Sequence, residues 1–126
     1  MRIKGISSED LLQQHLKHPQ FRAEWERTTL ARAVAIAVIR YRAERKLSQA
    51  GLAKLVGMSQ SNIARLEIGE HNPSVDMLQR LAKGLGLHFI LSVAPDGTGD
   101  LSLPPGVEVL SDVTSPDGSR VLAAVG

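Results

Sequence analysis

The chain has 126 residues, of which 43% are hydrophobic and 22% are charged, and its formal net charge at pH 7 is +2. This length suits one compact domain with tails and leaves no room for a second large core. The absence of cysteine excludes disulfides, thiolate metal sites and thiol catalysis, and it agrees with a cytoplasmic location. The most apolar run, residues 28–44, is too short to span a bilayer and contains Arg32 and Arg40. We therefore expect a buried helix there and no membrane partner.

The two ends of the chain differ in charge. Ten Lys and Arg residues and five acids precede Ser48, whereas one Arg and five acids follow Gly86. A basic front and an acidic tail indicate that a polyanion binds at one end and that the tail serves another purpose. Ordinary solvated charge is the alternative interpretation.

Helical spacing of apolar residues begins near the start of the chain. A first short helix is predicted to end before Pro19, and a second short turn of helix follows over residues 21–25. A long helix is predicted over about residues 29–46, which includes most of the apolar run.

Three serines mark the starts of the next three helices. Ser48, Ser59 and Ser74 each precede a helical run and can accept a hydrogen bond from its first turn. Gly57 is predicted to form the turn between the first two of these helices, and the third is predicted to stop at the glycines of residues 84–86.

The pattern changes after these glycines. Residues 87–93, "LHFILSV", form a run that is too short for a helix and rich in β-formers, so they predict one strand. Residues 94–106 predict a turn-rich linker. Residues 107–113 and 120–126 predict either a weak hairpin or a tail that is disordered until it meets a partner.

The helix that follows Ser59 has an unusual polar face. A projection at about 100° per residue places Gln60, Ser61 and Arg65 on one side and the apolar Ile63 on the other. Gln can pair with adenine and Arg with O6 and N7 of guanine, and both edges are exposed in the major groove of DNA. Ala64 lies on the same side and would permit a close approach. This face therefore predicts base reading in DNA.

The preceding helix fits the same purpose. Ala53 leaves room where a second helix crosses, and Gly57 supplies the turn. Met58, Ile63 and Leu66 supply apolar contacts at the expected spacing. Together these residues predict a helix-turn-helix, for which a plain helical hairpin in a bundle is the structural alternative.

The stretch "LSQAGLAKLVGMSQSNIARLEIGEHNPSVDMLQRLAKGLGL" resembles the Xre or Cro/C1-type helix-turn-helix domain, and the resemblance covers about residues 38–87. It implies a mainly α fold in which a five-helix DNA-binding domain at residues 29–86 follows an N-terminal helical leader at residues 1–28. A dimerisation strand at residues 87–93 and an acidic tail at residues 94–126, either a hairpin or disordered, complete the expected organisation.

The resemblance also implies a DNA-binding set in and around the second helix of the motif: Gln49, Ser59, Gln60, Ser61, Asn62, Arg65 and Asn72. Within this set, Gln49 and Asn62 would contact phosphates, and the loop around Asn72 would lie along the DNA backbone. The residues of the polar face would reach base edges. The resemblance further implies that Arg42 pairs with Glu67 and braces the recognition helix.

One position departs from the family pattern. Gly51 stands where family members usually carry an acid. The loss of that acid removes a capping box and costs roughly 1 kcal/mol of helix stability. We expect the fold to tolerate this change.

The front of the chain carries a second resemblance. "HLKHPQFRAEWERTTLARAVAIAVIRYRAERKLSQ" is similar to the leader that precedes the same domain in HigA-like antitoxins, partners of ribonuclease toxins of the RelE/HigB type. The strand after the last helix is similar to strands that pair across a two-fold axis in antitoxins and related repressors. The resemblance implies a homodimer that binds a palindromic operator in double-stranded DNA, represses its own operon and neutralises a ribonuclease toxin.

Two questions stay open in this interpretation. Four apolar leader side chains are the candidate toxin anchors, with the acidic tail as a rival surface: Leu12, Leu16, Phe21 and Trp25. The alternative function is a stand-alone Xre-type repressor that has no toxin partner.

The sequence gives no sign of catalysis. It contains no nucleophile–base spacing, no paired-carboxylate pattern and no phosphate loop. His15 and His18 lie three residues apart but lack a third strong ligand, so we expect no metal and no cofactor.

Overall fold

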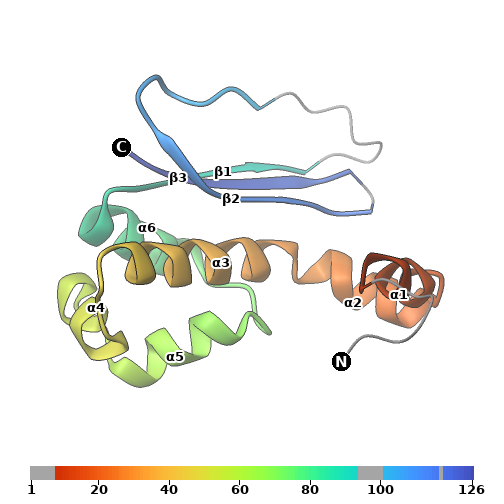
Figure 1. The fold of residues 1–126 in the computed structure, drawn as a ribbon, viewed down its shortest axis with the longest axis horizontal. Coiled ribbons are helices and arrows are strands. Elements are labelled where there is room, and N and C mark those ends of the chain that lie inside the picture. The colour runs from red at the N-terminus through yellow and green to blue at the C-terminus, as the bar shows by residue number, and fades with distance from the viewer. Residues whose placement is uncertain (1–7, 94–100, 117) are drawn as a thin grey trace.

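The computed structural model describes residues 8–93, 101–116 and 118–126, and these residues form six helices and three strands (Figure 1). The elements in chain order are α1 (Ser8–Leu16), α2 (Pro19–Arg27), α3 (Thr29–Glu44), α4 (Gln49–Val56), α5 (Gln60–Ile68), α6 (Val75–Leu85), β1 (Leu87–Ser92), β2 (Glu108–Thr114) and β3 (Arg120–Val125). Within the described ranges, no helix is long and apolar enough to cross a membrane.

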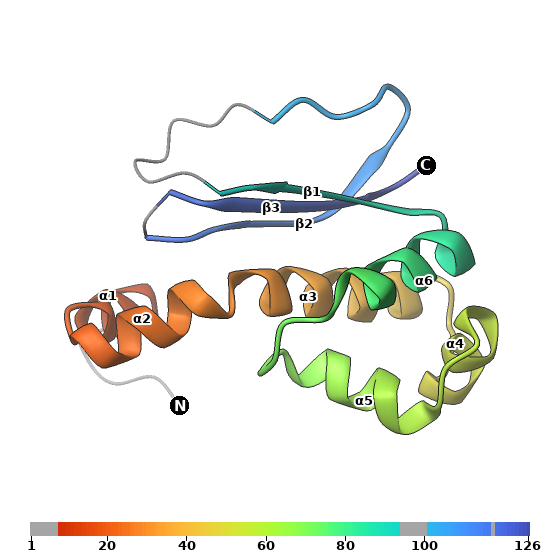
Figure 2. The same cartoon turned by 180° about the vertical axis from the view of Figure 1, so that it is seen from behind.

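The long helix α3 lies between two layers. The sheet covers one side of α3, and α4 and α5 lie on the other side (Figures 1 and 2). α6 packs on α4 and leads directly into β1. α1 and α2 extend from the end of α3 that lies away from α4 (Figures 1 and 2). The apolar run in the sequence forms α3, whose buried residues include Val34, Val38 and Tyr41.

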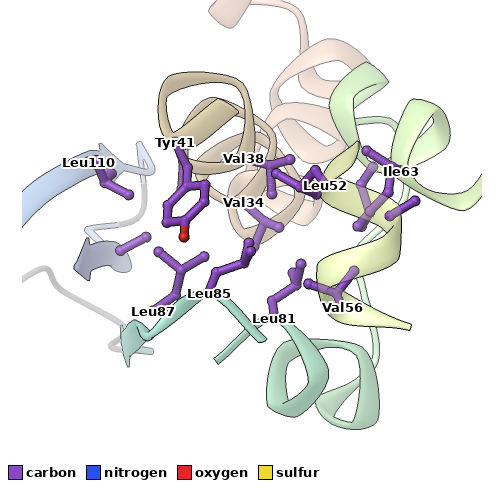
Figure 3. Close-up of a cluster of buried hydrophobic side chains, with 14 residues drawn as sticks. Val34, Val38, Tyr41, Leu52, Val56, Ile63, Leu81, Leu85, Leu87 and Leu110 are labelled. Atoms are coloured by element: carbon purple, nitrogen blue, oxygen red, sulfur yellow. The ribbon is translucent and has the colours of Figure 1, made fainter. Parts of the chain in front are cut away.

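The hydrophobic core joins both layers through α3. Val34 and Val38 meet Leu52 of α4 and Leu81 of α6, and none of these four side chains is exposed to solvent (Figure 3). Leu110 of β2 belongs to the same cluster. The helices α3 to α6 and the sheet therefore share one hydrophobic core.

The sheet is antiparallel and has the strand order β1-β3-β2. β3 occupies the centre, and residues 121–124 are all buried. Because side chains alternate along a strand, Ala123 faces the core while Leu122 and Ala124 point to the opposite face. Of the two structures predicted for the tail, a hairpin or a disordered segment, β2 and β3 form the hairpin. The strand predicted at residues 87–93 is formed as β1.

Two helical expectations differ from the structure. The domain expected to hold five helices at residues 29–86 holds four, because Gly86, with φ 70°, ends α6 and the chain turns directly into β1. Gly84 does not stop α6 but lies inside it. A Cβ at position 84 would lie 2.8 Å from Cγ1 of Val56 and 2.9 Å from the carbonyl oxygen of Leu55, so this glycine permits close packing of α4 on α6.

Candidate nucleic-acid interface

The turn between α4 and α5 has the geometry that the sequence predicts. Ser48 Oγ accepts a hydrogen bond from the Gly51 backbone N–H at 3.0 Å, and Ser59 Oγ accepts one from the Asn62 N–H at 3.2 Å. Gly57 lies between them with φ 67° and ψ 37°, a left-handed conformation that favours glycine. Both helices are therefore capped at their N-termini, and the Ser59 hydroxyl serves as one of these caps.

The inner face of α5 fixes its position. Ile63 is fully buried and Leu66 is 9% exposed, and both belong to the core that includes Val34 and Val38 of α3. Burial of two aliphatic side chains on one side of a short helix holds its opposite side toward solvent. Gln60, Ser61 and Arg65 are exposed on that outer side.

An ion pair connects α5 to α3. Arg42 Nε donates to Glu67 Oε2 at 3.1 Å, and Arg42 Nη2 donates to Glu67 Oε1 at 2.8 Å. These hydrogen bonds raise the pKa of Arg42 above its usual range, while partial burial acts in the opposite direction. Gln49 Nε2 also donates to Glu67 Oε1, at 3.4 Å. The pair expected from the resemblance is thus formed, and Gln49 lies beside it.

The side chain of Asn72 makes contacts within the protein. Its Oδ1 accepts a hydrogen bond from the Ala31 N–H at 3.0 Å, and its Nδ2 donates to the Arg27 carbonyl oxygen at 2.6 Å. Asn72 therefore ties the loop after α5 to the junction of α2 and α3. The role proposed for this loop along DNA would then depend on its backbone and neighbouring side chains rather than on the Asn72 amide.

Two hollows separate α5 from α6. One has a volume of about 350 Å³ and is bordered by Ser59, Asn62, Ser74 and Arg80. The other has a volume of about 170 Å³ and includes Arg65 and His71 in its lining, again with Asn62 and Ser74. Asn62 lies in both linings, next to the N-termini of α5 and α6. Helix N-termini favour anions such as phosphate.

Arg80 is a candidate that the sequence reasoning missed. It is exposed, and its Nη1 donates to the Gly57 carbonyl oxygen at 3.4 Å, which places its guanidinium at the turn. His71, which lines the smaller hollow, is a second candidate that the sequence did not indicate. The only sequence signal for Arg80 was a basic residue on the polar side of α6, a feature common to solvated helices.

Residues 38–91 match the family model described as Helix-turn-helix. This segment is therefore similar to helix-turn-helix domains. The match runs from the second half of α3 through β1 and covers less than half of the chain. Neither the curated proteins nor the solved structures gave a match.

The helices α1 and α2, which carry the leader candidates, lie at the far end of α3 from the α4–α5 turn (Figure 2). Leu12, Leu16 and Trp25 line a groove of about 470 Å³ together with residues 114–116, at the end of β2 and the start of the β2–β3 turn. Phe21 stacks on Trp25 with ring centroids 5.8 Å apart. The structure thus brings the front segment and the tail hairpin to one groove, although the sequence suggested that they were rival surfaces.

Arg32 of α3 fixes the position of Trp25. Its guanidinium carbon lies 3.7 Å from the centroid of the Trp25 ring, and its Nη1 donates to the Trp25 carbonyl oxygen at 2.6 Å. Burial lowers the pKa of Arg32. Within the chain, the ring of Trp25 therefore contacts both the guanidinium of Arg32 and the ring of Phe21.

Proposed function

We propose that this protein is a sequence-specific repressor that binds a palindromic operator as a homodimer and also neutralises a ribonuclease toxin encoded beside it. The base-reading part rests on one observation: Gln60, Ser61 and Arg65 are exposed on the outer face of α5, while Ile63 and Leu66 are buried on its inner face. Planar amide and guanidinium groups match the edges of adenine and guanine in the major groove. Gln49, Asn62 and the loop around Asn72 would anchor the domain on phosphates.

The dimer is proposed because one helix-turn-helix reads too few base pairs for useful specificity. β1 and β2 form the two edges of the sheet. Arg40 Nη1 donates to the Val109 and Leu110 carbonyl oxygens of β2 at 3.2 and 3.0 Å. Beside the other edge, Leu91 and Val93 are 51% and 79% exposed. Because Arg40 occupies carbonyl groups of β2 while apolar side chains are exposed beside β1, we favour β1 as the strand that pairs with its copy in a second subunit.

The antitoxin part rests on the groove between the leader and the β2–β3 turn. It offers the apolar side chains of Leu12, Leu16 and Trp25 on helices that lie outside the helix-turn-helix domain. Apolar anchors of this kind carry most of the energy when a helix or strand docks in a groove. The tail hairpin would take part in the same contact, because residues 114–116 also line the groove.

A stand-alone repressor without a toxin partner is the second candidate. The contacts of Arg32 with Trp25, and those of Asn72 with the α2–α3 junction, show that the leader has an internal structural role. A leader whose purpose is to support α3 needs no partner.

Binding to operator and random DNA tests the base-reading role. Arg65→Ala should weaken operator binding by roughly 1 to 3 kcal/mol and leave binding to random DNA nearly unchanged. Arg80→Ala is the matched control, since loss of a phosphate contact should weaken both complexes by a similar factor. An equal loss on both DNAs with Arg65→Ala would reject base reading by this residue.

Co-expression with the adjacent open reading frame tests the antitoxin role. Leu16→Asp should abolish growth rescue and co-purification, because it places a charge in the groove, while operator binding should persist. Ile36→Asp is the control, since Ile36 is 42% exposed on α3. Rescue that survives Leu16→Asp would reject the groove as the toxin-binding site. An adjacent frame that encodes no toxic protein would favour the stand-alone repressor.

A further inference from the structure

The DNA-facing side of α5 carries one large apolar side chain. Ile68 is the last residue of α5 and is 63% exposed. At about 100° per residue, Ile68 lies roughly 80° from Gln60, and Arg65 lies roughly 140° from Gln60 on the same side. In projection, Ile68 therefore falls between Gln60 and Arg65, and it lies at the C-terminal end of the face that carries them.

Folding does not account for isoleucine at this position. Among the described residues, the core and the side chains packed against it come from other positions, and the inner side of α5 contributes Ile63 and Leu66. An exposed β-branched residue also favours a helix less than alanine, leucine or lysine does. A large apolar side chain at the end of a face that otherwise carries Gln60, Ser61 and Arg65 points instead to a ligand surface with an apolar spot.

We propose that Ile68 contacts the 5-methyl group of a thymine in each operator half-site. This inference rests on the proposed function, since it requires that α5 enters the major groove. The thymine methyl is the apolar group that base pairs display there, and Ile68 has no polar atom beyond its backbone with which to read a base in another way. Gln60 and Arg65 would read hydrogen-bonding edges, and Ile68 would distinguish thymine from cytosine.

The helix geometry predicts where the thymine lies. Ile68 follows Arg65 by three residues, which is about 4.5 Å along the helix axis at about 1.5 Å per residue. Successive bases on one strand are about 3.4 Å apart. If α5 lies along the groove, the thymine is one or two base pairs from the base that Arg65 contacts, on the side of the C-terminus of α5.

Deoxyuridine substitution tests this contact, because it removes the 5-methyl group and keeps the base-pairing edge. The operator is first selected from random duplex DNA with the full-length wild-type protein, and each thymine is then replaced by deoxyuridine in turn. At one thymine per half-site we expect wild-type affinity to fall about fourfold per half-site, the equivalent of about 0.8 kcal/mol for one buried methyl group. Ile68→Ala should bind the thymine operator more weakly and be indifferent to deoxyuridine at that position.

Ile39→Ala is the matched control, since Ile39 is 40% exposed on α3 and this variant should retain the full deoxyuridine effect. If every thymine whose methyl affects the wild type affects Ile68→Ala equally, the contact is absent. The same conclusion follows if Ile68→Ala weakens a protein complex or the dimer and leaves operator affinity unchanged. A failure to select any DNA sequence would reject base reading itself, and this outcome differs from selection followed by a negative deoxyuridine scan.

Discussion

Arg42 on α3 and Glu67 on α5 are joined by two side-chain hydrogen bonds of 3.1 and 2.8 Å. The Glu67 side chain is 8% exposed and the Arg42 side chain 27%. The exposure of this ion pair is therefore intermediate between that of a solvated pair and that of a fully buried pair. Glu67→Gln should lower the free energy of unfolding by about 1 to 3 kcal/mol. Urea titration measures this change.

An exposed ion pair serves as the comparison. Arg40 and Glu44 lie one turn apart on α3, with side chains 46% and 38% exposed. Glu44→Gln should change the stability by no more than the error of the titration, because water replaces the lost contact. Equal effects of the two substitutions would show that the Arg42–Glu67 pair is solvated and does not brace α5.

Gly84→Ala should destabilise the protein by about 1 to 3 kcal/mol, although alanine favours helices by about 1 kcal/mol over glycine. The reason is that the added Cβ would meet Val56 Cγ1 at 2.8 Å and backbone atoms of α4 at 2.9 to 3.0 Å. Thermal unfolding monitored by circular dichroism measures the change.

Gly51→Ala is the same substitution in α4 and should have the opposite sign. Its Cβ would lie 3.3 Å from Ser48 Oγ, an exposed side-chain atom that can move by a few tenths of an ångström. We expect a gain of up to about 1 kcal/mol. A stabilising effect at both positions would mean that α4 and α6 can separate without cost.

The two glycines also show how far the sequence predicts this fold. The helix starts at Ser48, Ser59 and Ser74 could be predicted from the sequence, because capping involves only residues that are close along the chain. Each of these serines accepts the expected hydrogen bond. Gly84 taken by itself predicts a helix stop, because glycine is common at the ends of helices. Its actual role depends on how closely α4 approaches, which no local pattern encodes.

The candidate site divides in the same way. The exposed face of α5 could be predicted because helical periodicity separates Gln60, Ser61 and Arg65 from the core. The contacts of Asn72 could not be predicted, because its partner Ala31 lies 41 residues away. The groove at the leader required the β2–β3 turn to fold over α1 and α2, a long-range arrangement that neither segment reveals separately.

Asn72 should control the protection of the Ala31 amide against hydrogen exchange. Thr28, at the N-cap of α3, makes no side-chain capping bond, and Asn72 Oδ1 supplies an acceptor for the Ala31 N–H. Loss of one hydrogen bond is worth about 0.5 to 1.5 kcal/mol, so Asn72→Ala should speed exchange at Ala31 by roughly 2- to 13-fold. Exchange monitored by NMR measures this rate.

Asn72→Asp separates the two bonds of this side chain. Aspartate keeps an acceptor for the Ala31 N–H and loses the donor to the Arg27 carbonyl oxygen. Protection at Ala31 should therefore be retained in Asn72→Asp and lost in Asn72→Ala. Equal exchange rates in both variants would contradict the capping role.

Asp112 should give the β2–β3 hairpin an acid-dependent contribution to stability. Two hydrogen bonds from Arg120, at 2.8 and 2.6 Å, lower the pKa of Asp112, and burial opposes this shift. Because the folded-state pKa is depressed, the contribution is present above the ordinary aspartate pKa of about 3.9 and is lost as the pH falls through the folded-state value. Both side chains are more than a third exposed, so the effect should be small.

The pH dependence of Asp112→Asn tests this. At pH 7 the variant should be slightly less stable than the wild type, and the difference should shrink toward zero in acid below pH 4. Urea titrations across this range measure it. A difference that stays constant with pH would show that the carboxylate charge of Asp112 does not contribute.

The proposed dimer predicts that charge on the β1 edge separates the subunits. Leu91 lies on β1 and Val93 follows it, and both line a hollow of about 240 Å³ with Leu30 and Val121, which a second subunit would cover. Lysine at both positions would leave the fold intact, since both side chains are more than half exposed, and it would oppose pairing by repulsion across a two-fold axis. Sedimentation at micromolar concentration should show a dimer for the wild type and a monomer for the double variant.

Operator binding by the double variant should become weaker and non-cooperative, because each half-site would be bound separately. The matched control places lysine at Ile36 and Ile39, which are exposed on α3 and not on β1, and it should remain dimeric. A wild-type monomer that stays monomeric on DNA, or a double variant with unchanged dimer affinity, would reject pairing through β1.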